Sequence, residues 1–195
     1  NMRAGISHDL KTPLTRINLM IEELNNLELK DSISKNISEM NLMLNHYLDF
    51  IKNEKNENLD EFDIKILIQD LTNNYSKLKL TRNDSLSVLL RKNQISRAIS
   101  NILENADKFA EKIYMSSSVL DHSWVIIIED DGPGTSLSQE QLVKPFTKGA
   151  DQMNQGTGLG LSIVQKLVKL NNGELKFDNS VHGGLKVIIS FDISN

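Results

Sequence analysis

Two apolar stripes at helical spacing in the N-terminal part of the chain constrain the fold most. The first recurs every three or four residues over Ile6–Leu24, and the second does so over Ile33–Ile51. This spacing predicts two amphipathic helices, one ending near Leu29 and one near Lys55. An antiparallel pair with one stripe each buries both stripes poorly on its own. We therefore expect self-association into a homodimeric four-helix bundle.

The helical pattern is interrupted at Leu29-Lys30-Asp31-Ser32, where Asp31 or Ser32 can cap the second helix. The charged stretch Lys52–Asn58 is predicted to be a linker. These boundaries predict one domain over residues 1–57 and a second over residues 58–195.

The second domain is predicted to alternate helices with hairpin-like strands. Strands are expected near Leu59–Phe62, Lys77–Thr81, Leu86–Leu90, Ile113–Val119, Trp124–Asp130, Leu175–Phe177 and Leu185–Phe191. Helices are expected over about Ile64–Tyr75, Asn93–Phe109 and Leu159–Leu170, with a long polar loop over Gly132–Gly156. This order predicts an α/β sandwich with a mixed sheet, so the whole chain should be an α+β protein of two domains.

Composition excludes several classes of protein. The net charge of -4 gives no basic surface for nucleic acid, and the absence of cysteine excludes disulfides and thiolate metal sites. No apolar run approaches the roughly 20 residues of a membrane span, and no signal peptide is visible. Because the chain begins at Asn1 inside a helical pattern, we expect an excised fragment that lacks an upstream sensor or membrane anchor.

The first stretch with chemical potential is Ser7–Leu14. His8 and Thr12 are four residues apart, so they share one helix face, and Asp9 could take a proton from the imidazole or orient it. Pro13 removes a backbone donor and should bend the helix just past His8. The remaining histidines are interpreted as ordinary surface residues: His46, His122 and His182.

A polar helix face is predicted at Asn101, Asn105 and Lys108. Amide oxygens suit Mg²⁺, and a lysine suits phosphate. Taken alone, such a face is more often simply solvated.

The turn Asp130–Gly134 directly follows an apolar strand. Strand alternation places Asp130 in the row of Ile126 and Ile128, and Asp131 on the other side. A carboxylate at the end of an apolar row could accept a hydrogen bond from the exocyclic amine of a purine. The alternative is a turn that merely closes the strand.

A glycine-rich stretch, Gly156–Ile163, opens the last helix. Its glycines allow close approach of phosphate to a helix N-terminus. It is neither a Walker A loop nor a dinucleotide-binding fingerprint, so alone it is a weak signal.

In this order and spacing, the four stretches resemble the H, N, G1 and G2 boxes of bacterial two-component sensor histidine kinases, and the first box looks especially EnvZ-like. Lys144–Gly149 falls at the F box of that family, and His182-Gly183-Gly184 at its last glycine turn. The resemblance covers essentially the whole chain. It implies a dimerisation and phosphotransfer hairpin, followed by an ATP-binding domain of the superfamily that includes gyrase, MutL and Hsp90.

The resemblance also implies roles for single residues. His8 would be the phosphoacceptor, Asp9 its general base, and Thr12 the residue that positions water for a phosphatase reaction. Asn105 would ligate Mg²⁺. The expected nucleotide-binding residues are Asn101, Asn105, Lys108, Asp130, Gly132, Gly134, Lys148, Gly156, Thr157, Gly158, Leu159 and Gly160. Residues between Gly134 and Gly156 would form a mobile ATP lid.

The chain departs from the family pattern at two places in or near the expected lid, and neither departure removes a catalytic group. Lys148 stands where relatives often carry arginine, and Thr135-Ser136 replaces a common Ile-Pro pair.

The implied function is ATP-dependent autophosphorylation of a histidine, followed by transfer to an aspartate of an OmpR-like response regulator. The chain would be the cytoplasmic portion of an inner-membrane sensor. Two alternatives stay open: a superfamily ATPase without phosphotransfer, and a pseudokinase scaffold that only dimerises. The His8–Pro13 stretch argues against the first alternative, and the intact boxes argue against the second.

Overall fold

The computed structural model describes residues 17, 21, 27–51, 57–147 and 158–194. The chain divides into two compact units, residues 1–52 and 53–195. None of the described helices is long and apolar enough to cross a membrane.

The first unit contains the helix α2, Leu27–Ile51. Ile21 and Ile37 form a buried apolar cluster against which Ile33 and Leu44 pack. Ile33, Ile37 and Leu44 belong to the predicted second stripe and pack as expected, whereas Met40, which was also assigned to that stripe, is exposed.

The predicted helix end near Leu29 is wrong, as is the predicted cap at Asp31 or Ser32. These residues lie in the first turns of α2, which already begins at Leu27. Leu27 and Leu29 are exposed, so they do not belong to a buried stripe. Their two-residue spacing looked like a break in the pattern, but Leu27–Ser32 contains no glycine or proline to stop a helix.

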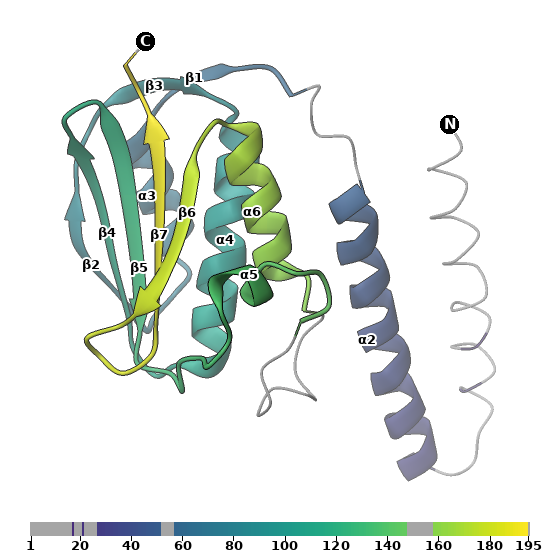
Figure 1. The fold of residues 1–195 in the computed structure, drawn as a ribbon. Helices are drawn as coiled ribbons and strands as arrows, with labels where there is room; N and C mark the ends of the chain where they lie inside the picture. Colours follow the sequence, from purple (N-terminus) through teal and green to yellow (C-terminus); the bar gives the residue numbers. More distant parts are fainter. Residues whose placement is uncertain (1–16, 18–20, 22–26, 52–56, 148–157, 195) are drawn as a thin grey trace. The chain divides into compact units, whose positions relative to one another are not determined.

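The second unit is an α/β sandwich (Figure 1). Its elements in chain order are β1 Asp60–Asp63, α3 Ile64–Thr72, β2 Leu78–Asn83, β3 Ser87–Leu90, α4 Lys92–Phe109, β4 Ile113–Leu120, β5 Ser123–Asp130, α5 Gln139–Leu142, α6 Gly160–Leu170, β6 Glu174–Asn179 and β7 Leu185–Asp192. The predicted helices and strands of this unit are confirmed, and the largest shift is at the end of α3, which closes at Thr72 and not near Tyr75. The short helix α5 was missed inside the predicted polar loop.

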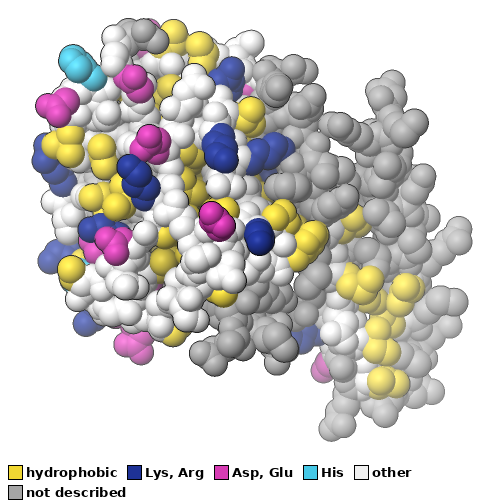
Figure 2. Space-filling model, viewed as in Figure 1, with side chains coloured by type: hydrophobic (Ala, Val, Ile, Leu, Met, Phe, Trp, Pro, Cys, Tyr) yellow, Lys and Arg dark blue, Asp and Glu magenta, His cyan; other side chains and the backbone are white. Residues whose placement is uncertain are grey.

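The main sheet has five strands in the order β2-β4-β5-β7-β6, and β1 pairs with β3 in a separate two-stranded sheet. The β2–β4 pair is parallel and the other pairs of the main sheet are antiparallel, which confirms the predicted mixed sheet. Helices α3, α4 and α6 cover one face of this sheet (Figure 1). On the side of the unit seen in Figure 2, hydrophobic side chains are interspersed with charged ones.

The core lies between the sheet and the three helices. Trp124 is fully buried, and its ring lies 5.6 Å from that of Phe191 and 6.4 Å from that of Phe62. Its indole N–H donates to Ser117 Oγ at 2.9 Å, so the polar end of this large side chain is satisfied. Ile126 and Ile128, which follow Trp124 in the same row of β5, are also buried, so Asp130 lies at the end of a packed central strand.

Candidate nucleotide site

Three segments that are distant in sequence meet at one end of the second unit: the C-terminal half of α4, the turn after β5, and the start of α6. A Cβ built on Gly160, the first residue of α6, would lie 3.2 Å from Asn105 Nδ2 and 3.6 Å from Asn101 Oδ1. A Cβ built on Gly132 would lie 3.1 Å from the carbonyl oxygen of Phe109. The three stretches singled out in the sequence are therefore neighbours in space.

Asp130 is half-buried and held by backbone donors from two sides. Its Oδ1 accepts hydrogen bonds from Gly132 N at 2.9 Å and from Leu185 N at 3.2 Å. Burial raises the pKa of this carboxyl above its ordinary value, although both backbone bonds act in the opposite direction. Among the described residues, both of these backbone donors bind Oδ1. Oδ2 is therefore the oxygen that can accept a hydrogen bond from a ligand.

Gly184 also belongs to this site, although the sequence placed it only at a glycine turn and gave it no binding role. Its N–H donates to the carbonyl oxygen of Asp130 at 3.1 Å. A Cβ at this position would overlap Asp130 Oδ1 and lie 2.6 Å from Gly132 N. Only glycine allows the β6–β7 turn to approach Asp130 this closely. The sequence feature that could have indicated this close approach is the glycine pair Gly183-Gly184.

The polar face of α4 is placed as predicted. Asn101 and Asn105 are half-buried beside Gly160 and Lys108 is exposed, whereas Ile99, Ile102, Leu103 and Ala106 are buried. Asn101 Nδ2 donates to the carbonyl oxygen of Arg97 at 2.8 Å, which fixes the orientation of the amide.

These amides fit a magnesium ion bound together with phosphate. The described residues contain no cluster of three or more histidine, cysteine or carboxylate side chains that could hold a metal by itself. Mg²⁺ typically keeps several waters and uses one or two protein oxygens plus substrate phosphates. The amide oxygens of Asn105 and Asn101 meet that requirement.

The start of α6 is anchored to the F-box segment. Gly158 has φ +68°, and a Cβ there would lie 2.8 Å from the carbonyl carbon of Phe146. Phe146 N donates to Gly158 O at 2.8 Å. Leu159 is fully buried, so its side chain packs beneath the site and only its backbone could face a nucleotide.

Gly134, with φ +66°, lies against the β6–β7 turn, where its Cβ position is 3.3 Å from Gly183 O. The remaining predicted site residues lie outside the described residues: His8, Asp9, Thr12, Lys148, Gly156 and Thr157.

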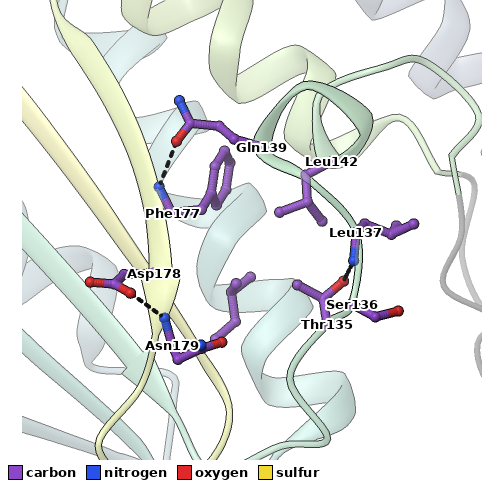
Figure 3. A pocket seen from close by; sticks show the side chains of 9 residues that line it. Thr135, Ser136, Leu137, Gln139, Leu142, Phe177, Asp178 and Asn179 are labelled. Carbon is purple, nitrogen blue, oxygen red and sulfur yellow. Dashed lines mark hydrogen bonds between the residues drawn. The ribbon is translucent and has the colours of Figure 1, made fainter.

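A cavity of about 270 Å³ lies next to the Asp130 turn, between α5 and the edge strand β6 (Figure 3). Its lining includes Thr135 and Ser136, the pair that departs from the family pattern, and Leu185, whose N–H binds Asp130. Gln139 Oε1 accepts from Phe177 N at 3.5 Å across it. The helix α5 beside the cavity begins with a capping box of Ser138 and Gln141, and this Ser-x-x-Gln pattern was the sequence signal for the missed helix.

Comparison with known proteins gives two family matches. The family described as "Histidine kinase-, DNA gyrase B-, and HSP90-like ATPase" matches residues 91–195, and "His Kinase A (phospho-acceptor) domain" matches residues 1–56.

Individual relatives agree with these matches. The sensor histidine kinase GtrS of Pseudomonas aeruginosa is 29% identical over 94% of this chain and 40% of its own length. CpxA of Escherichia coli is 30% identical over 95% of this chain and 45% of its own length. The chain thus spans less than half of either relative. The crystal structure of full-length ShkA with AMPPNP superimposes with a TM-score of 0.71 at 20% identity, over 97% of this chain and 45% of ShkA.

Proposed function

The chain belongs to the histidine kinase-, DNA gyrase B- and HSP90-like ATPase family and carries the two domains of a two-component sensor histidine kinase core; from this premise we propose that it phosphorylates its own His8 with ATP and passes the phosphoryl group to an aspartate of a response regulator. The convergence of Asp130, Asn105 and Gly160 at one end of the sandwich carries this proposal, because it brings an adenine acceptor, amide ligands and a helix N-terminus together.

Each group has a defined task in the proposed reaction. Asp130 accepts from the adenine amine, and Lys108 faces the phosphates. Asn105, with Asn101 alongside, would hold Mg²⁺, which when bound neutralises charge on the phosphates. The glycines at 132 and 134 line the base pocket. The remaining residues proposed to flank the phosphates are Lys148, Gly156, Thr157, Gly158, Leu159 and Gly160.

In the chemical step, an imidazole nitrogen of His8 attacks the γ-phosphorus and ADP leaves with the electrons of the broken bond. Asp9 takes up the imidazole proton as general base. Thr12, one helical turn further on, positions water against the phosphoaspartate of the regulator in the reverse, phosphatase reaction. Loss of Thr12 should therefore slow dephosphorylation of the regulator and leave autophosphorylation largely intact.

The proposed assembly is a homodimer in which residues 1–57 form the phosphotransfer bundle and residues 58–195 the ATP-binding domain. The proposed partner is an OmpR-like receiver domain, and the chain is proposed to be the cytoplasmic portion of an inner-membrane sensor. The relatives support this setting, because they are named as sensor proteins and are more than twice as long as the part matched here.

Incubation with γ-labelled ATP tests the function. Acid-labile, base-stable label on the protein is expected, and it should be absent from His8→Ala and strongly reduced in Asn105→Ala. Free phosphate without labelled protein would instead identify an ATPase, and neither product would identify a scaffold. Time courses of regulator dephosphorylation with Thr12→Ala then test the separate roles of His8 and Thr12. The assignment would be refuted if Thr12→Ala abolished labelling of this protein while the regulator lost its phosphate at the parental rate.

A further inference from the structure

Asp131 faces away from the proposed nucleotide and holds the segment between α4 and β4. Its Oδ1 accepts from Glu111 N at 2.9 Å and from Lys112 N at 2.8 Å, and its own N–H donates to Lys112 O at 3.3 Å. These bonds hold the pKa of the Asp131 carboxyl below its ordinary value, with the Lys112 bond as the largest cause. The side chain is therefore an ionised acceptor at neutral pH, and charge-assisted bonds of this kind are stronger than neutral ones.

A second anchor, located just before β2, holds the end of α4 itself. Lys77, just before β2, donates from Nζ to the carbonyl oxygens of Asp107 at 2.6 Å and Ala110 at 3.1 Å. A lysine at this position satisfies carbonyls that the helix end leaves without partners. Together with the Gly132–Phe109 approach, these contacts fix the last turn of α4 against the turn after β5.

The anchored turn follows directly after the residues that would meet the phosphates. Asn105 and Lys108 lie within the last turns of α4, which ends at Phe109, and Asp131 is the immediate neighbour of Asp130. A shift of the helix end would therefore move the phosphate side of the site relative to its adenine side.

We propose that Asp131 is a positioning residue of the nucleotide site: it sets the distance between the adenine-binding Asp130 and the phosphate-facing Asn105 and Lys108. This inference rests on the proposed binding of ATP. It assigns Asp131 no contact with the nucleotide. Its consequence is that loss of Asp131 weakens the phosphate contribution to binding and leaves the adenine contribution in place.

The test compares two ligands of different reach. Displacement of a fluorescent ATP analogue gives two dissociation constants, the Kd of Mg-ATP and the Kd of adenosine. Mg-ATP contacts both the adenine side and the phosphate side of the site, whereas adenosine contacts only the adenine side. Asp131→Ala should raise the Kd of Mg-ATP about tenfold and that of adenosine by no more than about twofold. Asp131→Asn retains a side-chain oxygen for the two backbone donors and should bring Mg-ATP back to within about threefold of the parent.

Asp192→Ala is the matched control. Asp192 Oδ1 also accepts from a backbone N–H, that of Ser194 at 2.9 Å, but it lies at the other end of β7 from Leu185. This variant should bind both ligands like the parent. If Asp131→Ala does not fold, Lys77→Met releases the same helix end and should again raise the Kd of Mg-ATP more than that of adenosine.

Two results would overturn the inference. Equal losses for both ligands would mean that Asp131 merely supports the whole fold of the site, and unchanged Kd values would mean that the anchor does not matter. A parent protein that binds no Mg-ATP would instead refute the proposed function, which keeps the two failures distinct.

Discussion

Replacing Gly184 by alanine should disable the adenine half of the site. The new Cβ would overlap Asp130 Oδ1, and it would lie 2.5 Å from the carbonyl oxygen of Asp130 and 2.6 Å from Gly132 N. Two of these atoms belong to the backbone, so no side-chain rotation relieves the overlap. The β6–β7 turn or Asp130 must move.

The size of the effect follows from the bonds that this movement breaks. Asp130 accepts from Gly184 N, Leu185 N and Gly132 N. At about 1 kcal/mol net for each bond, Gly184→Ala should cost about 3 kcal/mol of unfolding free energy. It should also raise the Kd of Mg-ATP at least about tenfold, because roughly 1.4 kcal/mol of lost adenine contact already gives that factor.

The neighbouring glycine provides a matched control. Gly183 has φ +106° and has nothing within 4 Å of its Cβ position. Gly183→Ala should therefore lose about 1–2 kcal/mol through its backbone conformation alone and keep the parental Kd. Urea unfolding and calorimetric titration of both variants make the comparison. Parental affinity in Gly184→Ala, or equal loss of affinity in both variants, would refute the reasoning.

Three further predictions concern stability, pH and assembly. Asn171→Ala should cost about 1–3 kcal/mol in urea unfolding, because buried Gln94 Oε1 loses the Nδ2 donor that lies 2.9 Å away; nucleotide affinity should not change. Burial raises the pKa of Asp130 above its ordinary value of 3.8, so between these two values Asp130 is ionised in the unfolded chain but protonated in the folded protein. The free energy of unfolding should therefore fall as pH rises through this window. Asp130→Asn should remove this contribution to the pH dependence. Ile37→Asp should dissociate the proposed homodimer or unfold the chain, since Ile37 is only 3% exposed and a charge there would lack a partner; light scattering that shows an intact dimer would contradict this.

The sequence predicted the second unit well because its pattern is strong and local. Val125–Ile128 is an apolar run that ends in Asp130, and α4 and α6 have regular stripes of buried residues. Each of these segments has a single favourable way to bury its apolar side chains, so sequence position and structure agree.

The errors occurred where the local pattern and the buried pattern differ. Leu27 and Leu29 are apolar but exposed, so the start of α2 looked like an interruption of the helical pattern. The helix α5 has no buried residue, so it leaves no apolar pattern in the sequence. Its capping box was the local feature that indicated a helix.

The spacing of residues in the sequence could not predict contacts between distant segments. The roles of Gly184 and Asp131 depend on which backbone atoms the fold brings to Asp130 and Lys112. Sequence alone placed Asp131 on the other side of the strand from Asp130, but it could not say what that side would meet.

The helix α4 is held by remote residues at both ends. At its start, Glu57 Oε1 accepts from Asn93 N at 2.8 Å, in the place of a local cap. Arg91 joins the carbonyl oxygen of Glu57 to that of Leu170 at the end of α6, with both distances at 3.1 Å.

Glu57 lies within the predicted linker stretch Lys52–Asn58, so the end of that stretch is bonded to the same helix that presents Asn101 and Asn105. At the other end of that helix, Lys77 holds the last turn, and Asp131 holds the segment that follows it.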